Sequence, residues 1–461
     1  MGDLRSTLDA ASSSVPRFSA DVGLSREVVV EISRQKNEPD WMLRKRLDAF
    51  ERFQSVSLPS WGPSLTSLDL QAITYFVRPE ANESRSWDDV PSSIRTTFEQ
   101  LGIPEAERAS LSGVGAQFDS DVVYHNLKKE WEALGVVFLN MDEALRQHED
   151  MVREYFMTQC VPVHDHPFAM LHAAVWSGGT FIYVPKGVTV DIPMQAYFRM
   201  NAERGGQFEH TLIIADEGSE VHYIEGCSAP KYSTRALHAG CVEIFVKRGA
   251  RVKYSSIENW SKNTYNLNTK RAVVDEDGTI EWLNGNLGSG VTMLYPMSVL
   301  RGARARSSYL GVAFAGPGQV QDTGAKAALV APGTSATIRA KSLSMGGGTS
   351  TYRGLVKVTP AAKRATVHVQ CDALMLDGDS VSETIPVMSV DGADALVSHE
   401  AAVGRIGDQE LGYLMSRGLT AEAARRCIVG GFLEPIVADL PLEYAIELEK
   451  LIDLEMEGSI A

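Results

Sequence analysis

The chain has 461 residues, of which 44% are hydrophobic and 22% charged, as expected for a soluble globular protein with two or three domains. Its formal net charge of -15 argues against nucleic acid or an anionic membrane as the main partner, because phosphate binding needs clustered Lys and Arg. The first residues lack the apolar core of a secretory signal, and no run approaches the roughly 20 apolar residues that span a bilayer, so we expect a cytoplasmic protein.

Residues 1–160 are predicted to form a mainly helical N-terminal domain. The segment 41–50 carries apolar residues at helical spacing and follows Pro39, which suits a first helical turn. Further helices are expected at 92–101, 104–111 and 142–157. Residues 56–85 are rich in Pro, Ser and aromatic side chains, which indicates irregular structure, and no motif assigns a function to residues 56–115.

A turn glycine followed by a short alternating strand recurs through the middle of the chain. The repeat begins at six glycines: Gly187, Gly218, Gly249, Gly302, Gly333 and Gly392. The first three are 31 residues apart, and a fixed period of this size is typical of stacked structural units. Residues 161–405 are therefore predicted to form a β-solenoid core. A β-sandwich is the alternative, whereas the lack of crossover helices argues against a doubly wound sheet.

A helical pattern returns near the C-terminus, in residues 406–461. One helix is expected at 408–416, closed by Gly418, and a second from an N-cap at Thr420 to about residue 438. Pro441 opens a third helix at 442–455. We expect this helical domain to bury most of its apolar face on the solenoid, and the alternative is that a partner covers it.

Three residues near the end of the predicted solenoid carry metal-binding chemistry. Cys371 follows the predicted strand 366–370, and His399 and Glu400 follow the last repeat glycine. Thiolate, imidazole and carboxylate suit iron, zinc or an iron–sulfur centre, and neighbouring coils lie about 4.8 Å apart. The alternative is a buried structural cysteine beside an exposed His-Glu pair.

The other four cysteines are scattered, without a Cys-x-x-Cys pair, so no disulfide framework is expected. Cys227 stands at a glycine-bordered strand end, where it is either a nucleophile or sulfur carrier or a buried turn residue. Cys160, Cys241 and Cys427 lie in apolar surroundings and are expected in the core.

His164, His166 and His172 form a cluster in the sequence. A His-x-His pair in an extended segment puts both rings on one face, as metal sites require, but no thiol or carboxylate at convincing spacing completes the set. The role of these histidines therefore stays open. Gly346-Gly-Gly348 is not followed by the Lys-Ser/Thr of a phosphate loop, so the chain itself is not expected to bind a nucleotide.

Several longer motifs, in order from about residue 30 to the end, resemble the SufB/SufD family of iron–sulfur cluster assembly proteins, and its SufB branch most closely. They are Asn37-Glu-Pro-Asp-Trp-Met-Leu43, Ala174-Val-Trp-Ser-Gly-Gly179, Phe181-Ile-Tyr-Val-Pro-Lys-Gly187, Gln195-Ala-Tyr-Phe-Arg199, Ile224-Glu-Gly-Cys227, Asn268-Thr-Lys-Arg271 and Leu454-Glu-Met-Glu-Gly-Ser459.

The resemblance implies a right-handed parallel β-helix core flanked by N-terminal and C-terminal helical domains. It implies a non-enzymatic scaffold subunit of the SUF system, carrying a transient iron–sulfur cluster. The implied partners are a SufC-type ATPase docked on the C-terminal helices, a SufD or second SufB subunit, and a cysteine desulfurase or sulfur-transfer protein. Cluster type, iron donor and any flavin involvement are not implied.

The resemblance also implies roles for particular residues. Cys227 matches the sulfur-accepting cysteine of the family, and Cys371 and Glu400 match positions where a cluster is built at a subunit interface, with His399 adjacent. Positions along the sulfur path of the family are matched by Arg199, Asn201, Trp260 and Lys270.

Two other functions remain open at this stage. One is a SufD-like structural subunit without cluster-building cysteine chemistry, although the presence of both Cys227 and Cys371 favours SufB. The other is a polysaccharide-acting β-helix enzyme, a class that is commonly secreted, and the missing signal sequence argues against it. Some relatives carry a cysteine cluster near the N-terminus, but this chain has no cysteine before Cys160.

Overall fold

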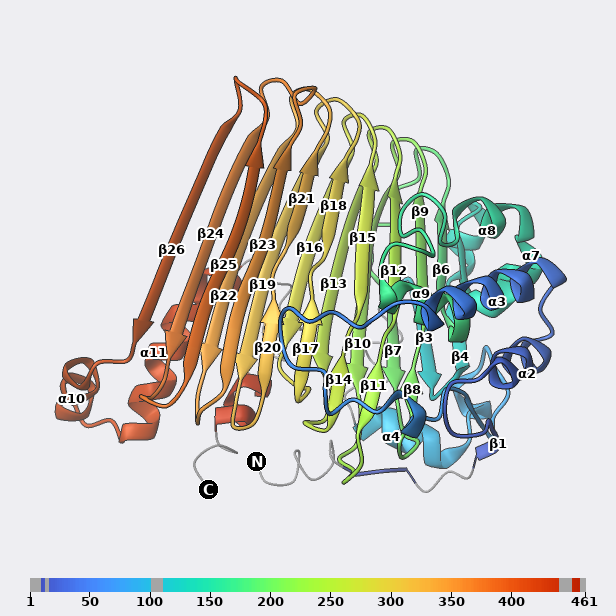
Figure 1. Ribbon diagram of the computed structural model, residues 1–461, viewed down its shortest axis with the longest axis horizontal. Helices are drawn as coiled ribbons and strands as arrows, with labels where there is room; N and C mark the ends of the chain where they lie inside the picture. Colours follow the sequence, from blue (N-terminus) through green and yellow to red (C-terminus); the bar gives the residue numbers. More distant parts are fainter. Residues whose placement is uncertain (1–9, 13–15, 101–110, 439–449, 457–461) are drawn as a thin grey trace.

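The computed structural model describes residues 10–12, 16–100, 111–438 and 450–456. Its main feature is a pair of β-sheets, one of 10 strands and one of 14. The chain passes from one sheet to the other and pairs in parallel with the next coil, so residues 179–405 form a parallel β-solenoid of about 8 turns (Figure 1). The solenoid predicted from the repeating glycines is confirmed.

The strands of the two sheets follow each other regularly along the solenoid (Figure 1). The 10-stranded sheet contains β3 (Gly113–Phe118), β4 (Asp121–Leu127), β7 (Met194–Arg199), β10 (Glu220–Ser228), β13 (Arg251–Asn259), β16 (Thr279–Asn286), β19 (Arg306–Ala315), β22 (Ser335–Ser344), β24 (Thr366–Met375) and β26 (Leu396–Arg405). The 14-stranded sheet contains β5 (Val137–Asn140), β6 (Gly179–Val184), β8 (Gly206–Gln207), β9 (His210–Ala215), β11 (Ala236–His238), β12 (Cys241–Val246), β14 (Thr264–Asn266), β15 (Thr269–Val274), β17 (Val291–Leu294), β18 (Met297–Leu300), β20 (Val320–Thr323), β21 (Lys326–Leu329), β23 (Thr349–Val358) and β25 (Val381–Val390).

Four of the six repeat glycines occupy left-handed turns between the sheets. Gly187, Gly218 and Gly249 have φ values of 72°, 67° and 67°, a conformation that glycine adopts without steric cost. In the next two coils the left-handed position is taken by Asp277 (φ 55°) and Arg304 (φ 59°). The sequence repeat therefore becomes irregular after Gly249 although the coils continue.

Helices and short elements precede, follow and flank the solenoid. They are β1 (Pro16–Ser19), α2 (Arg26–Lys36), α3 (Asp40–Gln54), η1 (Leu70–Ala72), β2 (Val77–Pro79), η2 (Trp87–Asp89), α4 (Ser92–Gln100), α6 (Lys129–Ala133), α7 (Met141–Gln147), α8 (Glu149–Tyr155), α9 (Pro167–Val175), α10 (Asp408–Ser416) and α11 (Ala421–Val437). Pro39 is the N-cap of α3, and the helix predicted at 142–157 is divided into α7 and α8 at His148. Most of the helix predicted at 104–111 lies outside the described residues.

Residues 113–140, predicted as part of a mainly helical domain, contain three strands. β3 pairs in parallel with β7 and antiparallel with β4, and β5 pairs antiparallel with β6, so these strands extend both sheets of the solenoid. All six residues of β3 are buried. A strand that is buried on both faces shows no alternation of polar and apolar residues, which is the signal that the sequence analysis relied on.

Apolar packing holds the solenoid and its flanking helices together. Side chains from both sheets fill the solenoid interior, including Tyr254, Trp282 and Ile338. Helices α2, α3 and α9 pack on the outer face of the 14-stranded sheet. Val429 and Leu433 of α11 pack on the outer face of the 10-stranded sheet, which confirms the expected burial for α11, whereas no residue of α10 is buried.

The C-terminal helices begin and end at the predicted signals. The Thr420 hydroxyl accepts a hydrogen bond of 3.1 Å from the amide of Ala423 at the start of α11, and Gly418 has a φ of 96° after α10. Of the third predicted helix, residues 450–456 are helical and the rest lies outside the described residues. None of the described helices is long and apolar enough to cross a membrane.

Candidate functional site

Cys227 points into the solenoid interior from β10. Its neighbours in register are Phe198 on β7 and Glu258 on β13, and its side chain is 4% exposed. The Cys227 Sγ lies 3.9 Å from Oε1 of Glu225. Burial, together with Glu225 and other nearby carboxylates, raises the pKa of the Cys227 thiol well above its ordinary value. A base is therefore needed to form the thiolate.

Lys270 faces Cys227 from β15 of the opposite sheet. Its Nζ lies 2.5 Å from Oε1 of Glu258 and 2.9 Å from the hydroxyl of Ser256, and both charged side chains are fully buried. Burial opposes the charged form, but Glu258 and Glu225 hold the pKa of Lys270 above its ordinary value. A positive charge is thus fixed inside the solenoid close to the cysteine.

Trp260 lies beside this charged cluster, immediately after β13. Its ring centroid is 4.3 Å from that of His238, whose Nε2 lies 2.5 Å from Oε1 of Glu209. Burial opposes protonation of His238, but Glu209 raises its pKa above the ordinary value. Trp260 packs with the interior side chains and also lines a surface pocket, so it separates the charged interior from that pocket.

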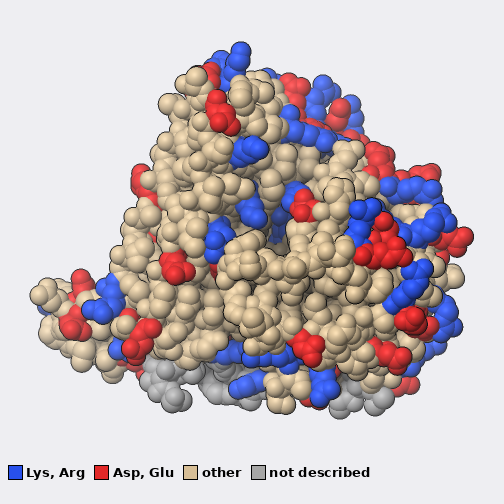
Figure 2. Space-filling model, viewed as in Figure 1, with Lys and Arg blue, Asp and Glu red and all other residues tan. Residues whose placement is uncertain are grey.

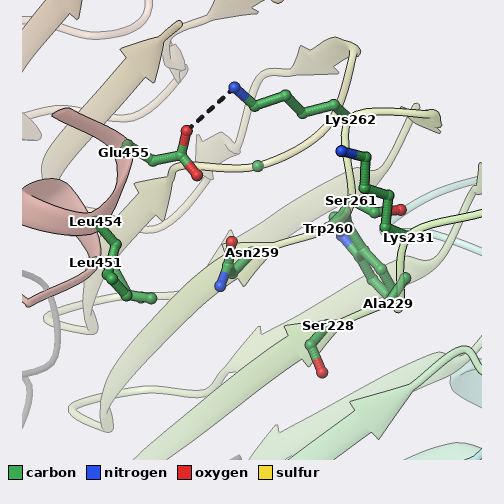
Figure 3. Close-up of a pocket in the computed structure, with 11 residues that line it drawn as sticks. Ser228, Ala229, Lys231, Asn259, Trp260, Ser261, Lys262, Leu451, Leu454 and Glu455 are labelled. Carbon is green, nitrogen blue, oxygen red and sulfur yellow. Dashed lines mark ion pairs between the residues drawn. The ribbon is translucent and has the colours of Figure 1, made fainter. Parts of the chain in front are cut away.

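The surface pocket lies next to Cys227 in the sequence and in space. Ser228, Trp260 and two lysines, Lys231 and Lys262, line one side (Figure 3). Leu451, Leu454 and Glu455 of the C-terminal helical segment close the other side, and Glu455 forms an ion pair of 3.4 Å with Lys262 (Figure 3). The C-terminal segment therefore lies across this pocket from Trp260, which also contacts the interior cluster.

Arg199 and Asn201 lie apart from the interior cluster. Arg199 pairs in register with Ser228, so it leaves the outer face of the sheet while Cys227 faces inward. Its Nη1 lies 3.3 Å from the Ser228 hydroxyl, and its Nη2 donates to the carbonyl of Ala10. The side-chain oxygen of Asn201 accepts a 2.8 Å hydrogen bond from the amide of Ser12. Of the predicted path residues, only Trp260 and Lys270 share the interior with Cys227.

A row of inward-facing residues, here called the inner row, connects the region of Cys227 with Cys371. One residue on each successive strand contributes to it: Glu225, Ser256, Asn284, Gly311, Ala340 and Cys371. Cys227 lies two residues from the first member, on the same face of the same strand. The row spans five strand spacings, or about 24 Å.

The side chains of the inner row are polar near Cys227 and become small and apolar toward Cys371. The amide nitrogen of Asn284 donates a 2.9 Å hydrogen bond to the hydroxyl of Ser256, which also accepts from Lys270. The side-chain oxygens of Asn284 and of neighbouring Asn286 have no hydrogen-bond partner among the described residues. Buried polar atoms without a protein partner are the usual sites of internal water. The beginning of the row is therefore suited to a hydrated or anionic guest.

Cys371 is the last residue of the inner row. It lies at the end of the solenoid formed by the final strands β25 and β26, here called the open end. Its Sγ lies 3.1 Å from Nε2 of His399 on β26, the last strand of the 10-stranded sheet. Burial and the neighbouring Asp372 raise the pKa of the Cys371 thiol to about 11. The Cys371 thiol and the His399 imidazole are thus already close enough to bind one metal ion together. Cys371 lies on the strand next to the edge of the sheet, and His399 lies on the edge strand.

Glu400 lies at the same edge of the sheet but on its other face. It pairs in register with Gln370, and Cys371 pairs with Ala401, so the side chains of Cys371 and Glu400 leave opposite faces of neighbouring strands. The described contact between the two residues is from the Cys371 Sγ to the backbone oxygen of Glu400, at 3.6 Å. In this conformation the imidazole, not the carboxylate, accompanies the thiol.

Two family descriptions match the chain: "SUF system FeS cluster assembly, SufBD core domain" over residues 198–432 and "SufBD protein N-terminal region" over residues 109–196. The Bacillus subtilis (strain 168) iron-sulfur cluster assembly protein SufB is 51% identical over 443 residues, which cover 96% of this chain and 95% of that protein. The chain belongs to the SufBD family. SufBD family proteins of Staphylococcus epidermidis and Staphylococcus aureus are each 52% identical over the same coverage.

The family matches explain the main sequence motifs of this SufBD chain. The core-domain match includes both Cys227 and Cys371, and the N-terminal match includes the strands that extend the two sheets. The chain is thus a SufB-type iron–sulfur cluster assembly protein of the SUF system, as the motifs indicated.

The predicted positions of the remaining cysteines and histidines of this SufBD chain are only partly correct. Cys160 and Cys241 are buried as predicted, but Cys427 is exposed on α11, so its prediction as a core residue is wrong. The ring of His166 caps α9 by accepting from the amide of Ala169. His172, on α9, lies instead beside His210 on β9.

Several interior residues of the site were missed in the sequence analysis. They are Glu209, Glu225, His238, Ser256, Glu258, Asn284 and Asn286, all buried. Each lies in a strand or beside one at a position where an apolar residue is the usual choice. Polar residues at the inward positions of successive repeats are the signal that would have found them, once the strands are aligned on their turns.

Proposed function

We propose that the chain is a scaffold that accepts sulfur at Cys227, moves it along the inner row and builds an iron–sulfur cluster at the open end beside Cys371. The inner row supports this proposal, because inward-facing positions on successive strands lead from the strand that holds Cys227 to Cys371. Family membership supports iron–sulfur assembly as the process.

Sulfur acceptance begins with the Cys227 thiol. Glu225 is the nearby proton acceptor, because burial raises the pKa of its carboxyl to about 7 and the thiol lies within 3.9 Å. The thiolate attacks the outer sulfur of a donor persulfide, forming the Cys227 persulfide and releasing the donor thiolate. A cysteine desulfurase or sulfur-transfer protein is the proposed donor, approaching through the pocket that Trp260 and the two lysines line (Figure 3).

Transport to Cys371 covers about 24 Å, too far for direct transfer between the two cysteines. Two electrons from a reductant outside this chain would break the S–S bond and release hydrosulfide. The fixed charge of Lys270 and the amide groups of Asn284 and Asn286 would stabilise this anion at the start of the row. Arg199 and Asn201 are proposed to act indirectly, by positioning the end of β10 through Ser228 and the segment around Ser12.

Iron is proposed to bind at Cys371 with His399 as the second ligand from this chain. Glu400 faces the other side of the edge strand, so it becomes a ligand only if β26 rearranges. Binding and hydrolysis of ATP in a SufC-type partner on the C-terminal helices would supply that rearrangement. The chain itself binds no nucleotide in this proposal and acts as a scaffold, not an enzyme, in the cytoplasm.

The remaining ligands are proposed to come from a SufD subunit or a second SufB copy at the open end. β25 and β26 are the last strands of the two sheets, each 10 residues long. Their exposed apolar side chains include Val390, Leu396 and Val403. The visible surface over this end carries few charged side chains (Figure 2). Long edge strands with few charged side chains are surfaces that pair with another chain.

Anaerobic reconstitution with iron and sulfide tests the role of Cys371. The Cys371→Ala variant is expected to lose the visible absorption of the assembled cluster while keeping its fold and its binding to the ATPase partner. Cys427→Ala, an exposed cysteine on α11, is the matched control and should assemble normally. Normal cluster yield from Cys371→Ala would refute the proposal and favour a SufD-like structural subunit.

A further inference from the structure

A second group of metal-ligand side chains lies between α9 and the outer face of the 14-stranded sheet, on the opposite side of that sheet from the solenoid interior that holds Cys227. His210 on β9 and Cys241 on β12 are direct neighbours in register, and His172 approaches them from α9. One ligand atom from each of the three residues lies within 4.8 Å of the other two, and all three side chains are buried.

The distance between the two histidines fits a shared metal ion. His172 Nε2 and His210 Nδ1 are 3.0 Å apart. Two nitrogen ligands of a tetrahedral zinc ion are separated by about 3.3 Å, because each Zn–N bond is about 2.0 Å long. The sheet thus already holds the two rings at nearly the separation that zinc requires.

The second ring nitrogen of each histidine, the one that faces away from the other ring, is also arranged as in metal sites. His172 Nδ1 lies 2.9 Å from the carbonyl oxygen of Ala239, so this nitrogen carries the proton and Nε2 presents a lone pair. His210 Nε2 lies 3.2 Å from Oε2 of Glu243. In metal sites, the ring nitrogen of a histidine that does not bind the metal usually donates its hydrogen to a carbonyl or carboxylate oxygen.

One ring nitrogen of His210 has no hydrogen-bond partner among the described residues. His210 Nδ1 lies against His172, and His210 Nε2, which faces the carboxyl group of Glu243, is the nitrogen left without a hydrogen bond. The carboxylate of Glu243 already accepts bonds from the amides of Met157 and Val161. A metal ion at Nδ1 would place the proton on Nε2, where Glu243 accepts it.

We propose that His172, His210 and Cys241 form a structural Zn²⁺ site that fastens α9 to the solenoid. Two imidazoles and one thiolate are typical zinc ligands, and a buried water would complete the tetrahedron. The site is separate from cluster assembly, since these residues leave the outer face of the sheet whereas Cys227 and Lys270 face its interior.

Metal analysis of the full chain tests the proposal, in a Cys371→Ser background so that zinc cannot occupy the assembly site. The protein is produced in zinc-supplemented medium, passed through a gel-filtration column with EDTA and analysed by mass spectrometry for zinc. The background protein should retain one zinc per chain. Cys241→Ser and His172→Gln should lose the zinc and lower the unfolding temperature by several degrees, whereas Cys427→Ser should keep it.

X-ray absorption at the zinc edge of the background protein keeps the proposal testable if the variants do not fold. One sulfur at about 2.3 Å and nitrogen or oxygen neighbours at about 2.0 Å are expected. Absence of zinc from the background protein, retention of zinc by Cys241→Ser, or a zinc shell without sulfur would each overturn the proposal.

Discussion

The solenoid interior around Cys227 holds charged residues where a protein normally places apolar ones. Glu209, Glu225, Glu258, His238 and Lys270 are all buried there. Removing one partner of a buried ion pair leaves an unpaired charge, which is far more costly than the net contribution of the pair. These residues therefore affect the stability of the fold as well as the chemistry at Cys227.

The Lys270–Glu258 pair provides a direct test at the residue scale. Lys270→Met should lower the free energy of unfolding by about 3–5 kcal/mol, because it leaves the Glu258 carboxylate without its 2.5 Å partner. The double variant Lys270→Met/Glu258→Gln should recover most of that loss. Denaturant titration of the three proteins measures both effects, and an unchanged stability in Lys270→Met would show that the pair is not intact in solution.

Glu225 predicts a pH dependence of stability. Burial raises its pKa to about 7, from 4.5 in the unfolded chain. The folded state then binds more protons between these two values, so the free energy of unfolding falls as pH rises from about 4.5 to about 7, by about 3 kcal/mol from this group.

Chemical unfolding at several pH values checks this prediction. Glu225→Gln should show a shallower decline over that range and greater stability than the parent protein at pH 7.5. Glu220→Gln, at an exposed position on the same strand, should keep the parental slope. A parental slope in Glu225→Gln would mean that its carboxyl ionises normally in the folded protein.

At the scale of elements, the sequence identifies strands best where one face is polar. The strands after Gly218 and Gly249 alternate and were predicted correctly, whereas Gly187 is followed only by an isolated bridge at Thr189. Thr420 and Gly418 marked the C-terminal helices correctly. Strands β3, β4 and β5 were missed because β3 is buried on both faces, and because β3 and β5 enter the sheets by pairing with β7 and β6, which lie far away in the sequence; β4 follows β3 in a hairpin. No local pattern encodes such contacts.

The sequence predicts only part of the candidate site, because the site is formed by residues that are far apart in the sequence. The motifs identify Cys227, Cys371 and Lys270, but the inner row appears only when the strands are in register. Register also decides which side chain accompanies Cys371: His399 shares its face, and Glu400, one residue further on, does not. A shift of one residue in a strand reverses its faces, which residue type alone does not reveal.

The edge strands at the open end predict an association surface. Val403 and Met388 are 51% and 36% exposed and face the interior side, where no further coil covers them. Val403→Lys should weaken association with a second copy or a SufD subunit, because pairing would bury the ammonium group.

Light scattering of the purified protein, alone and with the partner, measures this association. Leu134→Lys is the control, since Leu134 is equally exposed but follows α6 at the other end of the solenoid. If Val403→Lys and the parent protein associate equally, the open end is not the interface.

At the scale of the whole molecule, the solenoid separates the place where sulfur arrives from the place where it is used. The separation is useful only if the inner row conducts sulfur between them. Ala340 is the last member of the row before Cys371, and a larger side chain there would close it. Ala336 lies on the same face of the same strand, about 13 Å away and outside the row.

The most direct measurement follows isotopically labelled sulfur from a persulfide donor into the acid-labile sulfide of the assembled cluster, with iron and a reductant, under anaerobic conditions. Ala340→Leu should incorporate little label from the donor, as should Cys227→Ser, yet both should assemble clusters when free sulfide is supplied. Ala336→Leu should incorporate label like the parent protein. Full incorporation by Ala340→Leu, or an equal defect in Ala336→Leu, would contradict transport along the inner row.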